Sequence, residues 1–216
     1  IPMEWGVEPK PKYFLPEINA QWICALRSLI KMAELAGKSS QKFKKILSEA
    51  EKNFCGVFRS SALLYNVVCG EKSDITLGSP AVVAISMVSD LFAADEVKKF
   101  VDVIKENLLV YRKGLPFGIL VKNSEKRIYY GDDEYHEAMV WPRDTPYLIS
   151  LLKKVGDEET VERLLKSNLE HQMSEGFIFY NSELFSPDDG EMTPVKNPVQ
   201  FWSQWMDAFL LPKRKK

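Results

Sequence analysis

The stretch INAQWICALRSLIKMAELAG, residues 18–37, repeats apolar side chains every three or four positions and ends on a glycine. This spacing places the apolar groups on one face of an α-helix, and Gly37 is a usual helix-ending residue. Residues 41–58, QKFKKILSEAEKNFCGVF, have the same period with a lysine-rich opposite face, and Ser39 or Ser40 can cap them. Because only a short loop separates the two segments, the sequence predicts an antiparallel helix hairpin.

The pairing of amphipathic segments repeats along the chain. Residues 79–92 and 95–110 predict a third and a fourth helix, 144–156 and 157–176 a fifth and a sixth, and 199–211 a seventh. Residues 114–142 have scattered Gly, Pro and aromatic residues, which predicts a long irregular segment with room for a short strand pair. Helix pairs joined by alternating short and long loops are typical of an α/α toroid, one of several all-α architectures that this pattern allows.

Composition and charge narrow the class of protein. The 216 residues are 45% apolar, enough for one large core, and we expect a single domain over residues 1–216. Basic and acidic residues number 29 and 30, so the overall charge favours neither nucleic acid nor a membrane surface as a partner. The sequence has no apolar run of about 18 residues, no signal-peptide pattern and no C-x-x-C spacing. We therefore expect a cytoplasmic protein with buried thiols.

Several kinds of chemistry have no support in the sequence. His136 and His171 are too far apart for a zinc-binding spacing, so we expect no metal site. No G-x-S-x-G, P-loop or dinucleotide motif is found, and we expect no cofactor and no nucleophilic serine. Carboxylates remain as the chemically competent groups.

Aromatic and acidic residues concentrate in three stretches: KYFLPEINAQW at 12–22, YYGDDEYHEAMVWPRD at 129–144, and FIFYNSELF to QFWSQW at 177–205. A sugar has apolar C–H faces and a rim of hydroxyls, so its binding sites combine aromatic platforms with charged hydrogen-bonding groups. Each tryptophan alone is as well explained as a core residue, but the clusters favour a carbohydrate site. Glycoside hydrolysis would then need two carboxyl groups.

Four motifs carry a resemblance to a known family. KPKYFLPEINAQWICALRSLIKMAEL, residues 10–35, resembles the Pro-Arg to Val-Glu-Ile-Asn-Ala-Leu-Trp helix of the C-terminal, amylo-α-1,6-glucosidase domain of glycogen debranching enzymes. Residues 63–86, YHEAMVWP at 135–142 and VQFWS at 199–203 are similar to later motifs of that domain, in the same order. The resemblance implies a glucoamylase-related (α/α)6 toroid that hydrolyses α-glucosidic bonds of glycogen or related α-glucans with inversion.

The resemblance also implies roles for particular residues. Glu183, in NSELF, matches the general base, and the general acid is expected outside this chain, which would be the C-terminal half of the toroid or slightly more. The remaining N-terminal part of the toroid is then an expected partner. The other acids of this loop, Asp188, Asp189 and Glu191, are expected to be turn residues. The implied substrate-binding residues are Glu17, Asn19, Trp22, Tyr135, His136, Trp141, Arg143, Asp144, Gln200 and Trp202.

Two departures from the family pattern keep other functions open. Residues 78–81, GSPA, replace the Arg-Pro-Asn-Gln of debranching relatives, and Trp141-Pro142 continues into Arg143-Asp144 instead of a second tryptophan. The alternatives are a glucoamylase-like α-1,4-glucan exo-hydrolase, a non-catalytic carbohydrate-binding remnant of the same fold, and an α/α protein-interaction domain.

Overall fold

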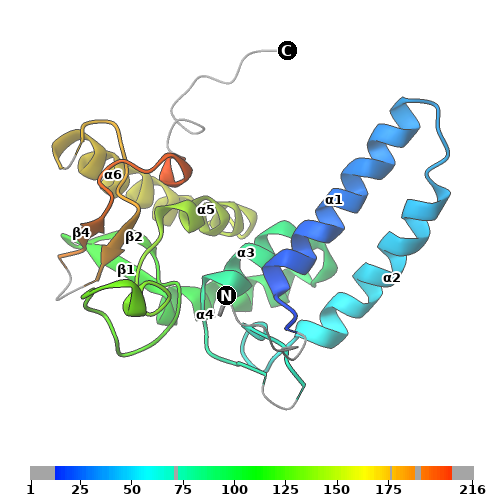
Figure 1. Cartoon of the computed structure of the whole chain (residues 1–216), viewed down its shortest axis with the longest axis horizontal. Helices are drawn as coiled ribbons and strands as arrows, with labels where there is room; N and C mark the ends of the chain where they lie inside the picture. The colour runs from blue at the N-terminus through cyan, green and yellow to red at the C-terminus, as the bar shows by residue number, and fades with distance from the viewer. Residues whose placement is uncertain (1–12, 71–72, 176, 188–190, 206–216) are drawn as a thin grey trace.

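The structure of the chain is a computed structural model that describes residues 13–70, 73–175, 177–187 and 191–205. Within these ranges α-helices follow one another in pairs (Figure 1). Their bounds are α1 Pro16–Leu35, α2 Gln41–Phe58, α3 Ser79–Met87, α4 Ala94–Asn107, α5 Thr145–Lys154 and α6 Glu158–Ser174. The predicted helix hairpins are therefore present.

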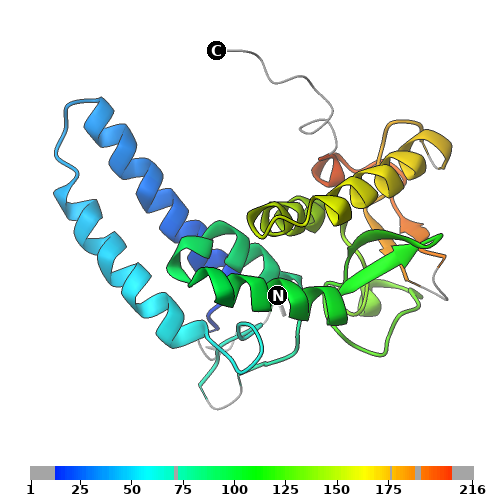
Figure 2. The same cartoon turned by 180° about the vertical axis from the view of Figure 1, so that it is seen from behind.

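The helices pack around one core. α1, α3 and α5 lie side by side in that order, while α2 packs against α1 and α6 against α5. Seen from behind, the helices describe an open arc, with α1 and α2 at one end and α5 and α6 at the other (Figure 2). Residues from all along the arc belong to one buried apolar cluster, among them Ile23, Ala84, Ile104, Leu148 and Leu164. The described helices therefore pack as one unit around a shared core.

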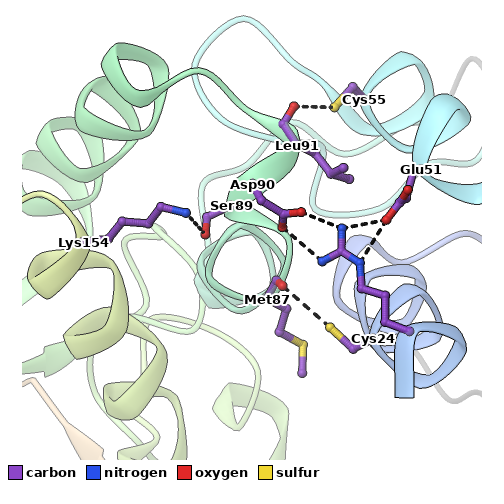
Figure 3. A network of polar contacts seen from close by, with 9 residues as sticks. Cys24, Glu51, Cys55, Met87, Ser89, Asp90, Leu91 and Lys154 are labelled. Carbon is purple, nitrogen blue, oxygen red and sulfur yellow. Dashed lines mark hydrogen bonds and ion pairs between the residues drawn. The ribbon is translucent and has the colours of Figure 1, made fainter. Parts of the chain in front are cut away.

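A network of polar contacts joins the helices outside the core (Figure 3). Arg27 on α1 donates to Glu51 on α2 at 2.6 Å and to Asp90 at 2.7 Å. Asp90 lies in the short 3-10 turn η1 (Ser89–Leu91). The hydroxyl of Ser89, in the same turn, accepts a hydrogen bond from Lys154 at the end of α5 at 2.6 Å. The turn after α3 is thus tied to α1, α2 and α5.

The thiols and the helix lengths bear on two general expectations. Cys24, Cys55 and Cys69 are free thiols, but all three are partly exposed rather than buried. The first two donate to the carbonyls of Met87 and Leu91 at 3.6 and 3.7 Å, beside the Arg27 network (Figure 3).

Among the helices of the described ranges, none has both the length and the apolar character that crossing a membrane requires.

The predicted end of the fourth helix is wrong. α4 stops at Asn107, and the next residues form strand β1 (Leu109–Arg112), paired antiparallel with β2 (Leu115–Ile119). Lys113 and Gly114, with φ of 50° and 74°, form the two-residue connection. Two consecutive left-handed residues give a turn whose twist matches that of a hairpin. The apolar residues at 108–110 therefore continue the core from a strand.

The predicted seventh helix is also wrong in its described part. Residues 199–205 contain only the 3-10 turn η5 (Phe201–Ser203), and residues 206–211 lie outside the described ranges. A second antiparallel pair, β3 (Leu184–Ser186) with β4 (Thr193–Lys196), precedes it and was not predicted. Residues 197–203 follow β4 directly, so the pairing of β4 with β3 places them close to β3. Asp188 and Asp189 lie outside the described ranges, and Glu191 is exposed.

Single bridges connect the two sheets to the long irregular segment. Val140 bridges Leu120 on one side and Phe185 on the other, and its N–H and the N–H of Phe185 donate to each other's carbonyls at 2.9 Å. Phe185 is fully buried against Phe117 in an edge-to-face contact with ring centroids 4.8 Å apart. As a result, the start of β3 lies beside residues 135–144, and two of the three aromatic and acidic stretches meet.

Candidate functional site

Glu183 immediately precedes β3 and is held on every side. Its backbone N–H donates to the carbonyls of Lys196 and Asn197 at 3.1 and 3.0 Å, and its own carbonyl accepts from Ser203 Oγ at 3.3 Å. Its carboxylate accepts from the Tyr135 hydroxyl at 2.5 Å through Oε1 and from the Asn197 side-chain amide through Oε2. The residue is only 6% exposed. Glu183 is thus a nearly buried carboxylate in a defined orientation.

Tyr135 remains a hydrogen-bond donor to this carboxylate. Burial, followed by the hydrogen bond to Glu183 and its negative charge, raises the pKa of Tyr135 far above its ordinary value. The phenol therefore keeps its proton at any physiological pH. Lys196 Nζ lies over the Tyr135 ring, 4.8 Å from its centroid, and forms an ion pair with Asp132. A cation–π contact of this kind helps to hold the ring.

Aromatic rings extend from Tyr135 toward the end of the chain. Trp141 is 5% exposed and its ring centroid lies 5.1 Å from those of both Tyr135 and His136. On its other side Trp202 lies 6.2 Å away, edge to face. Arg143 covers the Trp141 ring at 4.1 Å and the Trp202 ring at 5.3 Å. Burial, and the positive charge of Arg143, lower the pKa of His136, so that side chain favours its neutral form.

A cavity of about 360 Å³ opens beside Arg143 and Trp202. Its wall includes the carboxyl groups of Glu17 and Asp144, and each has one oxygen, Oε2 and Oδ2 respectively, that lacks a hydrogen-bond partner in the described structure. The other residues of the wall are Ile18, Gln21, Ser79, Pro80, Val83 and Tyr147. Contacts run from this cavity through Arg143 and Trp141 to the Tyr135–Glu183 pair.

Both cavity acids are shifted toward their neutral forms. Asp144 is 2% exposed, and burial raises its pKa, although Arg143 Nε at 3.3 Å from Oδ1 and a hydrogen bond with Ser79 oppose the shift. Burial likewise raises the pKa of Glu17, and the nearby charge of Asp144 adds to the effect. Buried acids with unpaired oxygens are costly to a fold, and they are found more often where a ligand completes their hydrogen bonds.

Helical geometry explains why the first stretch divides between two places. Glu17 and Gln21 are four residues apart on α1 and face the cavity together. Asn19 and Trp22 point elsewhere: they line a groove of about 400 Å³ against α2, and Asn19 Nδ2 donates to the Leu15 carbonyl at 2.8 Å. The structure therefore gathers Glu17 with the Trp141 cluster and leaves Asn19 and Trp22 outside it.

Gln200 is placed next to the cluster through its backbone. Its N–H donates to the Asn181 carbonyl at 3.3 Å, and its carbonyl accepts from Ser203 N–H at 3.1 Å, which forms the turn η5. This turn presents Trp202, 37% exposed, to Arg143. Gln200 thus immediately precedes the turn η5 that carries Trp202, which contacts Trp141.

Sequence reasoning missed Asn197, Lys196 and Ser79. Asn197 and Lys196 lie in a Pro-bounded stretch whose sequence indicates only a turn. Ser79 follows Gly78, where an added Cβ would stand 2.4 Å from the Val121 carbonyl oxygen. Glycine allows this close approach, and the next residue, Ser79, donates its N–H to the same carbonyl and contacts Asp144 through its side chain.

The arrangement suits a polyhydroxylated ligand. An oriented carboxylate, a wall of indole and phenol rings, and a cavity with a guanidinium and two under-paired carboxyls supply acceptors, donors and flat apolar faces. In the described ranges no three His, Cys, Asp or Glu side chains are grouped so that they could hold a metal ion.

Solved structures share this fold. The chain matches an uncharacterized conserved protein from Thermus thermophilus with a TM-score of 0.67 and 14% identity, over 92% of this chain and 46% of that one. It matches a GH63 mannosylglycerate hydrolase from the same organism, solved in complex with glucose, with a TM-score of 0.65 and 14% identity, over 90% of this chain and 44% of that one. The chain thus spans less than half the length of either protein.

A third similar structure, titled "Sialidase", gives a TM-score of 0.66 and 14% identity, over 91% of this chain and 19% of that one. At such identities these likenesses show the fold alone, which is shared with GH63 glycoside hydrolases of the (α/α)6 type. No curated protein matches the chain in sequence. The family described as amylo-alpha-1,6-glucosidase, however, matches residues 11–206. The chain therefore belongs to the amylo-alpha-1,6-glucosidase family of glycoside hydrolases.

Proposed function

We propose that the chain is the C-terminal part of a single (α/α)6 toroid domain that hydrolyses α-glucosidic bonds of glycogen or related α-glucans with inversion, in the manner of a debranching enzyme. The observation that carries the proposal is Glu183, a nearly buried carboxylate held by two donors beside an aromatic wall. Family membership and the glycosidase fold support the reaction class.

In this proposal Glu183 is the general base. It takes a proton from the water that attacks the anomeric carbon, while a second carboxylic acid gives its proton to the leaving glycosidic oxygen. That acid would come from the remainder of the toroid. For inversion the two carboxyl groups should stand about 6.5–9.5 Å apart, which leaves room for the water.

Substrate hydroxyls would occupy the cavity of Glu17, Arg143 and Asp144. The unpaired oxygens of the two acids are covered in the described structure. We propose that a bound sugar displaces the covering side chains, so that its hydroxyls donate to these oxygens and accept from the guanidinium. Trp141 and Trp202 would contact the apolar faces of glucose units, and Tyr135 and His136 would complete the wall. Asn19, Trp22 and Gln200 lie outside this cavity. We propose that they contact neighbouring glucose units of a branched chain.

The exposed face of α1 supports the need for the remainder of the toroid. Leu29, Met32 and Leu35 recur at helical spacing and are between 39% and 80% exposed. A continuous apolar stripe on a helix normally packs against another element. Because this chain covers less than half of each similar structure, we assign this face to helices of the remaining part. We also propose that the whole protein acts in the cytoplasm.

The test uses the complete enzyme, with this chain and the remainder of the toroid. It would be given a branched limit dextrin and, separately, a linear maltooligosaccharide, and the first product would be followed by proton NMR. We expect glucose released from the branched substrate in its β form. Release in the α form would contradict inversion, preference for the linear chain would favour the glucoamylase-like alternative, and no release from either would indicate a non-catalytic remnant.

A further inference from the structure

Asn197 occupies an unusual position next to Glu183. It follows β4 directly and has a φ of 38°, in the left-handed region that non-glycine residues rarely adopt and that Asn tolerates best. Its carbonyl accepts the Glu183 N–H at 3.0 Å, and its side-chain amide donates to Oε2 of the same residue. One residue thus binds both the backbone and the carboxylate of Glu183.

The two donors to Glu183 come from separate parts of the chain. Tyr135 reaches Oε1 from the irregular segment, whereas Asn197 reaches Oε2 from the end of β4. A carboxylate held at one oxygen can still rotate about its last side-chain bonds, but one held at both oxygens has a fixed plane. Each oxygen keeps a second lone pair, which leaves the carboxylate able to accept a further proton.

We propose that Asn197 is the positioning residue of the general base: its left-handed backbone turns the side-chain amide onto Oε2 and fixes the plane of the Glu183 carboxylate toward the attacking water. This inference rests on the proposed function, since it assumes that Glu183 is the base. Backbone strain retained at a functional site is consistent with such a role. The amide is neutral, so it orients the carboxylate without adding a charge that would compete for the proton.

The charged and titratable groups around Glu183 define what a substitution would change. Tyr135 donates to it, Lys196 lies over the Tyr135 ring and pairs with Asp132, and Arg143 covers the neighbouring Trp141. None of these reaches Oε2 in place of Asn197. Removing the amide therefore leaves that oxygen without its protein donor.

The first test is Asn197→Gly in the complete enzyme. Glycine keeps the positive φ without strain and deletes only the amide. We expect kcat to fall about ten- to hundredfold, as for the loss of a hydrogen bond to a charged group, with KM and the unfolding midpoint near their wild-type values. Lys113→Gly is the matched control, because Lys113 also has a positive φ, of 50°, in the β1–β2 turn, and its side chain pairs with Glu175 rather than with Glu183. This control should retain full activity.

The second variant, Asn197→Asp, keeps the shape and tolerates the same φ but replaces the donor by a carboxyl group. Two carboxyl groups in contact disfavour each other's ionised forms, so the acidic limb of the pH–rate profile should move to higher pH. An unshifted limb would show that the side chain of residue 197 does not contact the Glu183 carboxyl group in the working enzyme. This variant also decides the question if the glycine variant does not fold.

Failure of this inference differs from failure of the proposed function. If Glu183→Gln is inactive while Asn197→Gly keeps kcat within about twofold of wild type, a change far below the loss expected for a charged hydrogen bond, Asn197 is not a positioning residue although Glu183 remains the base. If Glu183→Gln is fully active, the proposed function itself is wrong. An Asn197→Asp enzyme with an unshifted pH profile would likewise overturn the positioning role.

Discussion

Helix α1 contributes to two charged regions that are built in opposite ways. Around Arg27, the guanidinium donates to both carboxylate oxygens of Asp90 and to Oε1 of Glu51 (Figure 3), and the hydrogen bonds from Arg27 lower the pKa of Asp90. In the cavity at the start of the helix, Glu17 and Asp144 each keep an unpaired oxygen, and burial raises the pKa of both. The acids around Arg27 connect α1 to α2 and to the turn η1.

Each acid of the cavity keeps one buried oxygen without a hydrogen-bond partner in the described structure. A buried carboxyl oxygen without a partner costs free energy that folding alone gives no reason to retain. We therefore propose that the acids around Arg27 serve the fold and that Glu17 and Asp144 serve a ligand. We propose that Glu183 also serves a ligand, although both of its oxygens accept hydrogen bonds, because its donors Tyr135 and Asn197 lie outside the helices and connect no helix pair.

The largest expected effect is that of Glu183→Gln on hydrolysis by the complete enzyme. Glutamine keeps the size and can still accept from Tyr135, but it cannot take the proton of the attacking water. We expect kcat to fall by about 10²–10⁴-fold, the usual contribution of a general base. Glu191→Gln, an exposed acid of the same loop, is the control and should have wild-type kcat in the same glucose-release assay. Equal activity of the two variants would remove Glu183 from the mechanism.

A second, smaller effect concerns pH and the buried His171. The residue is fully buried beside Phe117 and Phe185, its Nδ1 lies 3.0 Å from Glu175 Oε2, and burial, with the charge of Arg112, lowers its pKa to about 4. Below its ordinary pKa the unfolded chain binds a proton that the folded chain does not. Stability should therefore decrease as the pH falls from about 6.5 to about 4, by about 3 kcal/mol from this residue.

The variant His171→Phe isolates this contribution. It keeps an aromatic ring in the same apolar contacts and removes the titrating group, so most of the loss between about pH 7 and about pH 5 should disappear. His136, whose pKa is also lowered, should account for part of what remains. Urea denaturation at the two pH values measures the difference. A variant with an undiminished pH dependence would show that His171 is not held neutral in the folded protein.

The first two helices could be predicted from sequence because their apolar residues recur at helical spacing. Residues 41–58 agree at both ends with α2, and residues 18–37 agree with α1 within two residues at each end. The turn at Lys113 and Gly114 and the β3–β4 pair could not be predicted in the same way. Their strands are short, and their pairing depends on partners that local periodicity does not reveal.

The candidate site was predictable to a similar degree. The resemblance placed Glu183, Trp141, Arg143 and Trp202 in one site, and the structure brings the last three into ring contacts that lead to the first. Asn197 could not be predicted from sequence, because its proposed positioning role depends on a backbone turn and on a contact with Glu183, 14 residues earlier. A turn sequence indicates that the chain bends, but it does not indicate which distant residue a side chain of the turn will contact.

The most direct test of the contrast between the two regions makes the same substitution in each. Asp144→Asn removes a charge whose burial is unfavourable, and because the folded pKa is raised, its ionisation costs stability at neutral pH. Asp90→Asn weakens a partly exposed ion pair worth about 1 kcal/mol or less. Urea denaturation at about pH 7 should find Asp144→Asn more stable than wild type and Asp90→Asn less stable. Destabilisation of both variants to the same extent would contradict the account.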